Sequence, residues 1–211
     1  MRESGVREHR TQAQRTAATR RRLLDATVAC LAELGYSRTS TTEIVRRAGV
    51  SRGAQVHHFP TKADLVASAL DHVFERRNAE FRAAFAEVPE GTNKAVAAID
   101  LLWSMFQGTT FDAFLELAVA ARTEPELQAR LATVMRRFHA NVGETFRELF
   151  PAPGGPGSLP DVAPSFIFAL LDGLALHRIA EDDPSPIADV LEMAKSLARL
   201  FMPDPPQEAR P

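Results

Sequence analysis

Residues 40–65, STTEIVRRAGVSRGAQVHHFPTKADL, decide the fold of the N-terminal part of this chain. Ser40 and Glu43 match a capping box, in which a hydroxyl and a carboxylate satisfy the first free amides of a helix. Gly49 suits the left-handed residue that ends this short helix, and Ser51 can cap a second helix two residues later. The spacing therefore predicts two short helices joined by a turn that contains glycine.

Longer helices are expected on both sides of this pair. Before it, a stripe at helical spacing stops at Gly35 and consists of Leu23, Thr27, Cys30, Leu31 and Leu34. After it, Thr61 and Asp64 open another helix with a capping box. One face of that helix collects Leu70, Phe74, Phe81 and Phe85. Two short helices between longer ones are typical of a helix-turn-helix.

Helical periodicity continues to the C-terminus, whereas alternating strand patterns are scarce. Further helices are expected over residues 94–106, 111–121, 123–150, 162–179 and 185–202. Residues 151–161 hold four Pro and three Gly and are expected to form a loop. The predicted fold class is all-α, with a three-helix N-terminal head, a helical body and about nine helices.

The composition is typical of a globular protein of the cytoplasm. Of 211 residues, 45% are hydrophobic and 25% are charged. The single Cys excludes a disulfide within the chain and a metal site made of thiolates alone, as expected in a reducing compartment. Residues 1–22 are rich in Arg and have no apolar run, so we expect no signal peptide. We also expect no apolar stretch near the ~20 residues of a membrane span, and hence a soluble protein with no membrane partner.

Charge is strongly segregated along the chain. Residues 1–62 carry 12 Lys and Arg against 5 Asp and Glu, whereas the remainder carries 13 against 22. This distribution indicates that one end meets a polyanion, although a basic tail before an ordinary acidic domain would show the same split. The expected division is a basic disordered leader (1–14), a helix-turn-helix domain (15–64), a helical body (65–202) and a tail (203–211).

The segments around the helix-turn-helix resemble the tetracycline-repressor (TetR) family of bacterial regulators. The matching segments are Leu23-Leu24-Asp25-Ala26, Leu34-Gly35-Tyr36, Thr39 to Ile44, Ala48 to Ala54 and His58 to Leu65. They span roughly residues 20–74, about a quarter of the chain, at fixed spacing. The resemblance implies a DNA-binding head whose second short helix, about residues 52–58, lies in the major groove. It also implies a body that binds a ligand and forms a homodimer.

The expected base-reading residues lie on that second short helix. Arg52 can read guanine with two hydrogen bonds, and Gly53 and Ala54 permit close approach or contact with a thymine methyl. His57 and His58 are expected to contact bases or phosphates. A metal site at this histidine pair is not expected, because adjacent residues project about 100° apart on a helix and no third ligand lies nearby.

Flanking residues are expected to contact the DNA backbone. Thr41 and Thr42 open the first short helix, where free amides and hydroxyls suit a phosphate oxygen. Lys62 matches the phosphate-contacting lysine of the family. The family usually has Leu-Tyr where this chain has Gln55-Val56, so Gln55 either reads an adenine or is partly buried. The Arg-rich leader either reaches a minor groove or is a solvated tail.

The body is expected to hold a dimer interface and a ligand pocket. In the resembled family the last two helices pair across a two-fold axis, which here would use Phe166, Ala169, Leu170, Gly173, Leu174, His177, Val190, Met193 and Leu197. Without that analogy these residues would simply be core. The middle helices would form a pocket from Trp103, Phe106, Gln107, Thr110, Phe114, Met135, Phe138 and His139. Plain core packing is the alternative for each apolar member.

These features favour a dimeric transcriptional repressor that a small organic effector releases from a palindromic operator. The alternative is a helical ligand-binding or catalytic protein with a non-functional head. No nucleophile elbow, phosphate-binding Gly loop or metalloprotease motif occurs in the sequence, so we expect neither an enzyme nor a cofactor. The sign of regulation is open.

Overall fold

The computed structural model describes residues 11–150 and 159–202, and within them the fold is all-α, as predicted. The nine helices of the described part are α1 (Gln12–Arg38), α2 (Thr41–Ala48), α3 (Arg52–His58), α4 (Lys62–Ala86), α5 (Lys94–Phe106), α6 (Thr109–Ala121), α7 (Pro125–Leu149), α8 (Leu159–Ala180) and α9 (Ser185–Phe201). The predictions for residues 1–10, 151–158 and 203–211 lie outside the described residues.

The starts of α1 and α8 differ from the sequence-based expectation. Helix α1 begins at Gln12, inside the predicted leader, because Thr11 and Gln14 form a capping box. Helix α8 begins at Leu159, inside the predicted loop that was expected to reach residue 161. The last three residues of the predicted loop, 159–161, therefore belong to a helix.

Gly35 interrupts α1 where the stripe was expected to stop. Its φ of 74° and ψ of 166° turn the chain, and the helical turn that follows ends at Arg38. Gly49 ends α2 in the left-handed conformation (φ 60°, ψ 43°), and Ser51 caps α3 by accepting a hydrogen bond from the Ala54 amide. The capping box of Thr61 and Asp64 opens α4 as predicted.

The capping box expected at Ser40 is only half formed. The Ser40 hydroxyl accepts from the Glu43 amide at 3.2 Å, but the Glu43 carboxylate binds Arg46 and Arg47 instead of the Ser40 amide. Charge-assisted bonds to two guanidinium groups are stronger than a bond to a backbone amide, which explains the difference.

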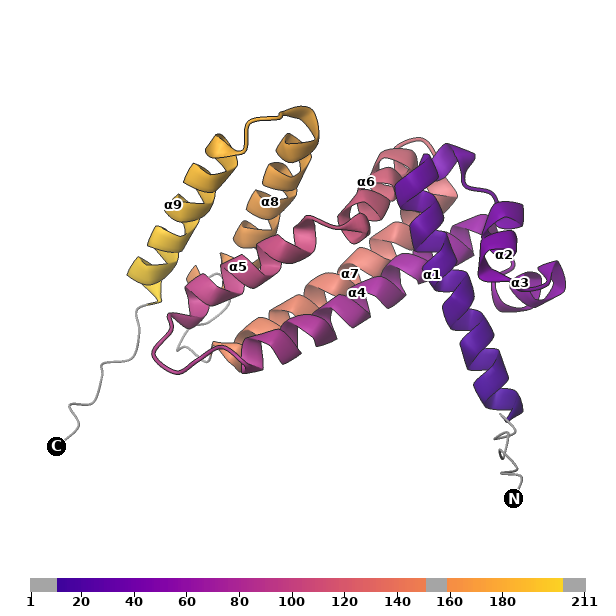
Figure 1. The fold of residues 1–211 in the computed structure, drawn as a ribbon, viewed down its shortest axis with the longest axis horizontal. Coiled ribbons are helices and arrows are strands. Elements are labelled where there is room, and N and C mark those ends of the chain that lie inside the picture. The colour runs from indigo at the N-terminus through magenta and orange to yellow at the C-terminus, as the bar shows by residue number, and fades with distance from the viewer. Residues whose placement is uncertain (1–10, 151–158, 203–211) are drawn as a thin grey trace, which may run out of the picture.

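The molecule is elongated, with α2 and α3 at one end and α8 and α9 at the other (Figure 1). Helix α4 starts at the head and runs through the body beside α7, so one continuous helix belongs to both parts. The head core consists of Leu23, Leu24, Cys30, Ile44, Ala48, Phe59, Leu65 and Ala69. Cys30, a member of the predicted helical stripe, is fully buried there. A second core joins α1, α4, α6 and α7, and burial of this apolar surface stabilises the contact between head and body.

Helix α8 is more apolar than the sequence analysis expected. Val162–Ala180 spans 19 residues with a mean hydropathy of 1.4, long and apolar enough to cross a membrane, so the expectation that no stretch approaches this length was wrong. Only 17% of this stretch is buried. A single helix of this kind is weak evidence for a membrane. Its exposed side chains include the large apolar residues Phe166 and Ile179.

Candidate nucleic-acid interface and ligand cavity

The rotation of α3 about its axis is fixed by Gln55. This side chain is only 3% exposed, and its amide nitrogen donates a 2.6 Å hydrogen bond to the Phe59 carbonyl oxygen. The assignment of Gln55 to the DNA-reading residues was therefore wrong, and the alternative of a buried Gln55 is correct. The hydrogen bond satisfies the polar group that burial would otherwise leave unpaired.

With Gln55 turned inward, the exposed side of α3 presents Arg52, Gly53, Val56 and His57. Three of these belong to the predicted set, but Val56 does not. Its side chain is 52% exposed, and an exposed aliphatic group is of the kind that contacts a thymine methyl in the major groove. Val56 could not be assigned from the sequence, because the burial of Gln55, which turns its neighbour Val56 to another side of the helix, was open there.

Ala54 and His58 lie at the edge of this surface and are half-buried. Burial is the main cause that lowers the pKa of His58, and the charges of His57 and Arg20 act in the same direction. His58 therefore favours the neutral form. Thr41 and Thr42 lie in the first turn of α2, half-buried and exposed respectively.

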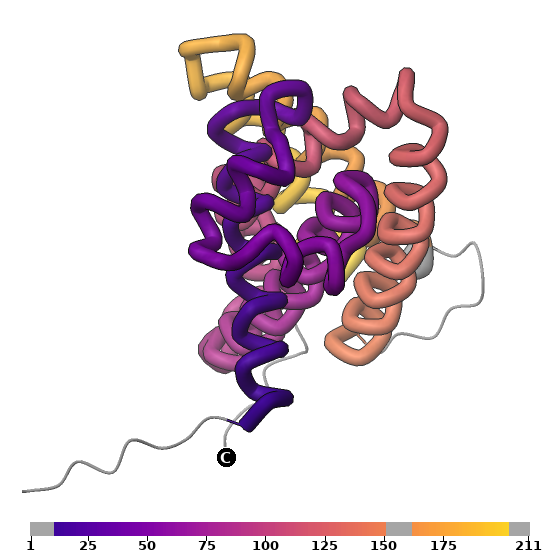
Figure 2. Tube along the Cα trace, turned by 90° about the vertical axis from the view of Figure 1, so that its right-hand side faces the viewer, coloured from indigo at the N-terminus to yellow at the C-terminus, as the bar shows by residue number. Residues whose placement is uncertain are grey.

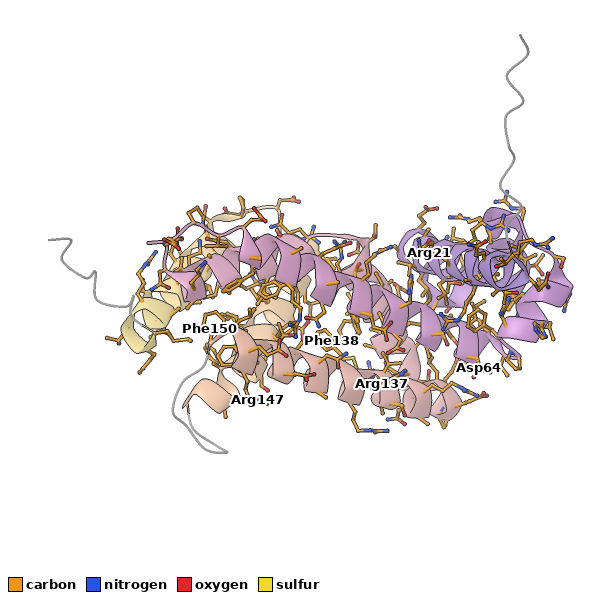
Figure 3. The ribbon with its side chains drawn as sticks, turned by 90° about the horizontal axis from the view of Figure 1, so that it is seen from below. Arg21, Asp64, Arg137, Phe138, Arg147 and Phe150 are labelled. Carbon is orange, nitrogen blue, oxygen red and sulfur yellow. The ribbon has the colours of Figure 1, made fainter. Side chains whose placement is uncertain are left out.

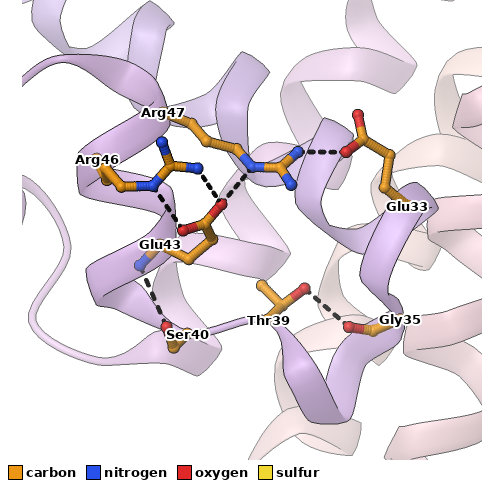
Figure 4. A network of polar contacts seen from close by, with 7 residues as sticks. All are labelled: Glu33, Gly35, Thr39, Ser40, Glu43, Arg46 and Arg47. Carbon is orange, nitrogen blue, oxygen red and sulfur yellow. Dashed lines mark hydrogen bonds and ion pairs between the residues drawn. The ribbon is translucent and has the colours of Figure 1, made fainter.

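Arg46 and Arg47 are held by acidic partners on the protein itself (Figure 4). Arg47 contacts Glu33 of α1 at 2.5 Å and Glu43 at 2.7 Å, while Arg46 contacts Glu43 at 2.6 Å. Hydrogen bonds from Arg46 and then Arg47 lower the pKa of Glu43 to about 2. These ion pairs link α2 to α1 and balance the positive charges of Arg46 and Arg47.

The remaining arginines of the described head have no ion pair there; they are Arg15, Arg20, Arg21, Arg22, Arg38 and Arg52. Four of them lie in the first turns of α1, which are largely exposed and project past the rest of the head (Figure 2). Arg20 lies beside α3, with its guanidinium carbon 5.6 Å from the Phe59 ring centroid. The unneutralised positive charge is thus concentrated on α1 and α3.

Lys62 points away from the exposed surface. Its ammonium donates a 2.8 Å hydrogen bond to the Tyr36 carbonyl oxygen and lies 3.8 Å from the centroid of the Tyr36 ring. Burial lowers its pKa. In this structure Lys62 joins α4 to α1, which differs from the predicted phosphate contact, because a backbone carbonyl and an aromatic ring lie within its reach.

Tyr36 is the centre of a junction between head and body. Its amide donates to Glu116 of α6 at 2.8 Å, and its hydroxyl donates to Glu124, the residue before α7, at 2.6 Å. Gly35 lies beside it with a φ of +74°, a conformation that side-chain-bearing residues rarely adopt, and an added Cβ would lie 2.8 Å from the Glu116 carboxylate, which would have to move. The junction was not predicted, because its partners lie 80 and 88 residues away in the sequence.

The body contains a partly open cavity of about 630 Å³ between α4, α5, α6, α7, α8 and α9. Six of the eight predicted pocket residues line it: Phe106, Thr110, Phe114, Met135, Phe138 and His139. The other two predictions were wrong. Trp103 packs on the core formed by α5, α8 and α9, and Gln107 is the exposed C-cap of α5. Figure 3 shows Phe138 and Phe150 between α4 and α7.

Sequence reasoning missed most of the polar lining. Arg77 contacts Glu80 at 2.8 Å and donates to the Thr110 hydroxyl at 3.3 Å. Asn78 accepts from the Thr145 hydroxyl, and Asp172 of α8 also lines the cavity. Periodicity gave no signal for these residues, because a polar residue that faces a cavity looks like one that faces solvent.

The predicted dimer residues divide into exposed and packed groups. Phe166, Ala169, Gly173, His177, Met193 and Leu197 are exposed. Leu170 and Val190 are half-buried against the core, and Leu174 is only 8% exposed, so Leu174 was assigned wrongly. Additional exposed apolar side chains are Val162, Leu176, Ile179, Leu200 and Phe201. We call the exposed residues of both lists the α8–α9 face.

Comparison with known proteins identifies the chain as a member of the TetR family. Residues 23–69 match the bacterial regulatory proteins of the tetR family, and residues 94–202 match the C-terminal domain of BetI-type transcriptional repressors. The chain is thus a helix-turn-helix transcriptional regulator of TetR and BetI type. This is a family of regulators rather than enzymes, which agrees with the sequence-based expectation.

An uncharacterized HTH-type transcriptional regulator of Mycobacterium tuberculosis is 35% identical over 169 residues, which cover 80% of this chain and 87% of that protein. Among solved structures, a transcriptional regulator from Rhodococcus sp. Rha1 is 26% identical with a TM-score of 0.60, covering 87% of this chain and 95% of its own. The multidrug binding protein EbrR, solved with imidazole, shares the fold at 24% identity and a TM-score of 0.60. The match covers 89% of this chain and 97% of EbrR.

Proposed function

We propose that this regulator is a cytoplasmic homodimer that represses transcription from a palindromic operator and is released by a small organic effector. The observation that carries the proposal is the exposed side of α3, where Arg52, Gly53, Val56 and His57 project from a helix of fixed rotation. A helix of this kind fits the major groove, where the base edges can be distinguished. Residues 15–64 would form the DNA-binding domain and residues 65–202 the effector and dimer domain.

The α8–α9 face supports the dimer. Met193 and Leu200 are 66% and 70% exposed, and an added Cβ on Gly173 would meet nothing within 4 Å, which leaves room for a partner helix. Burial of such a patch between two copies would remove apolar surface from water. A two-fold dimer would also present two copies of α3 to successive turns of the DNA, about 34–36 Å apart.

The junction at Tyr36 supports effector control. Helices α4, α6 and α7 line the cavity, and the same three helices or their starts contact Tyr36 through Lys62, Glu116 and Glu124. An effector that binds one arrangement of these helices more tightly would shift the spacing of the two heads. The structure of EbrR with imidazole supports a small-molecule site in this fold.

The test is selection of bound duplexes from a random DNA library by the purified full chain, followed by a salt titration of the selected duplex. We expect a palindrome with half-sites one helical turn apart and an affinity that falls steeply with salt. Arg52→Ala should weaken binding to the selected duplex. Arg136→Ala, which removes an exposed positive charge from α7 outside the head, is the control for the loss of one charge and should leave binding unchanged. Recovery of no preferred sequence would overturn the proposal in favour of a ligand-binding protein with an unused head.

A further inference from the structure

The last turn of α3 carries two adjacent histidines. His57 is exposed and His58 is half-buried, and their ring centroids lie 5.5 Å apart in an edge-to-face arrangement. Helix α3 itself lies at the end of the molecule opposite α8 and α9 (Figure 1). Imidazole is the side chain that ordinarily changes charge between pH 5 and 8. The surface proposed to face the operator therefore carries two groups that gain or lose a charge near neutral pH.

The neighbouring helix α1 places a positive charge beside this pair. The Phe59 ring has its centroid 5.6 Å from the Arg20 guanidinium carbon and 6.1 Å from the ring centroid of His58. Burial, followed by the charges of His57 and Arg20, lowers the pKa of His58. In residues 11–150 and 159–202, neither histidine of α3 takes part in an ion pair.

The charged side chains of the other helices near α3 are engaged elsewhere. On α2, Glu43 binds the two arginines of its own helix. On α4, Asp64 and Asp71 are each paired with an arginine of α7, and Lys62 is bonded to the Tyr36 carbonyl oxygen. Within the described part of the chain, the protein thus supplies no carboxylate that pairs with a protonated histidine of α3.

Operator DNA would supply the missing negative charge. A duplex carries about one phosphate charge per 1.7 Å of helix axis, and an anion close to an imidazole favours its protonated form. A histidine beside the phosphates of the complex therefore holds a proton more tightly than the same histidine in the free protein. By linkage, such a group strengthens the complex as the pH falls.

We infer that operator binding takes up protons at the His57–His58 pair of each α3, so that the regulator holds its operator more tightly at acidic than at alkaline pH. This inference rests on the proposed function, which places α3 on the DNA. Because no residue of α3 lines the cavity of the body, the proton would act on the operator complex independently of an effector bound there.

The test measures the affinity of the full chain for the selected duplex from pH 8 to pH 6 at constant ionic strength, by fluorescence anisotropy. We expect wild type to bind about tenfold more tightly at pH 6, since uptake of one proton changes the affinity by up to about tenfold per pH unit. The double variant His57→Gln/His58→Gln should lose most of this dependence, because glutamine forms hydrogen bonds and does not titrate. His139→Gln, at an exposed position of α7 outside the head, is the matched control and should retain the dependence.

A second variant keeps the test decisive if the half-buried His58 cannot be replaced without loss of folding. His57 is exposed, so His57→Lys should leave the fold intact, and lysine stays charged over this pH range. We expect His57→Lys to bind the duplex more tightly than wild type at pH 8 and to depend less on pH. The same pH dependence in His57→Lys and wild type would contradict a role for His57.

Calorimetry of the wild type at pH 7, in two buffers with different enthalpies of ionisation, counts the protons directly. We expect net uptake of protons when the duplex binds. No uptake, a flat pH profile, or full pH dependence in the double glutamine variant would each overturn the inference. Absence of operator binding at every pH would contradict the proposed function, whereas binding that does not vary with pH would contradict only the proton linkage.

Discussion

The Tyr36 hydroxyl donates a 2.6 Å hydrogen bond to Glu124, so the last turn of α1 is bonded to the residue that precedes α7. The Tyr36 amide donates to Glu116 of α6, and the Tyr36 carbonyl oxygen accepts from Lys62 of α4. Tyr36 is therefore bonded to α4, to α6 and to the residue before α7. Tyr36 is only 7% exposed. Head and body therefore meet at a bonded contact, in addition to the apolar core that they share.

Tyr36 is the one tyrosine of the chain, so its ionisation can be followed directly by absorbance. Burial is the largest cause that raises its pKa above the ordinary 10.0, and the hydrogen bond and charge of Glu124 raise it further. Because the folded state favours the neutral phenol, this stability is present below pH 10 and is lost as the pH rises through the higher folded value. We expect Glu124→Gln to lower the pKa of Tyr36. An identical titration in Glu124→Gln and wild type would show that the bond has no influence.

Gly35→Ala should destabilise the fold more than Gly49→Ala. At Gly35 a φ of 74° with a ψ of 166° is accessible essentially only to glycine, and the added Cβ would displace Glu116. We expect a loss of about 1–3 kcal/mol in the free energy of unfolding. Gly49 has left-handed φ and ψ and no atom near its Cβ position, so about 1 kcal/mol is expected there. Urea denaturation measures both, and equal losses would contradict the greater strain expected at Gly35.

Glu43→Gln should remove a pH-dependent contribution to stability. The pKa of Glu43 is lowered from 4.5 to about 2, so its contribution is present above pH 4.5 and is lost as the pH falls toward 2. We expect the wild type to have the higher thermal midpoint at neutral pH and the difference to shrink in acid. Glu144→Gln, at an exposed position, is the control. A difference that persists at about pH 2 would exclude the carboxylate as its source.

Val56 should read a thymine methyl, because it is the exposed aliphatic side chain of α3. Replacing the contacted thymine by uracil in the selected operator removes only that methyl. We expect a loss of about 0.8 kcal/mol, roughly fourfold, for wild type and none for Val56→Ala. Arg52→Ala should bind about 1–3 kcal/mol more weakly and still respond to uracil. A full uracil effect in Val56→Ala would show that another residue makes the contact.

Lys62→Ala should affect stability more than the salt dependence of DNA binding. Its hydrogen bond to Tyr36 is worth about 1 kcal/mol, and its ammonium is directed into the junction. Arg20→Ala, which removes an exposed cation beside α3, should instead lower the salt slope by about 0.9. A similar decrease in Lys62→Ala would show that its ammonium moves to a phosphate in the complex.

The sequence by itself determined the local features of this protein. Gly49, Ser51 and the pair of Thr61 and Asp64 define helix ends through bonds to residues at most four positions away, so their spacing was sufficient. Apolar periodicity likewise identified the helices and four residues that line the cavity, Phe106, Phe114, Met135 and Phe138, since burial of a helix face follows from its pattern.

Only the tertiary structure determined which hydrogen-bond partner each of several polar side chains has. Glu43 bonds to two arginines instead of the Ser40 amide, and Lys62 bonds to Tyr36 instead of facing the DNA surface. Asp172 lines the cavity because α8 packs beside α7, and its place as the one acidic residue of the apolar stretch Val162–Ala180 did not by itself reveal this. Which partner a polar side chain has depends on which groups lie within hydrogen-bond distance once the helices have packed. The packing of the helices is in turn set by residues that are far apart in the sequence.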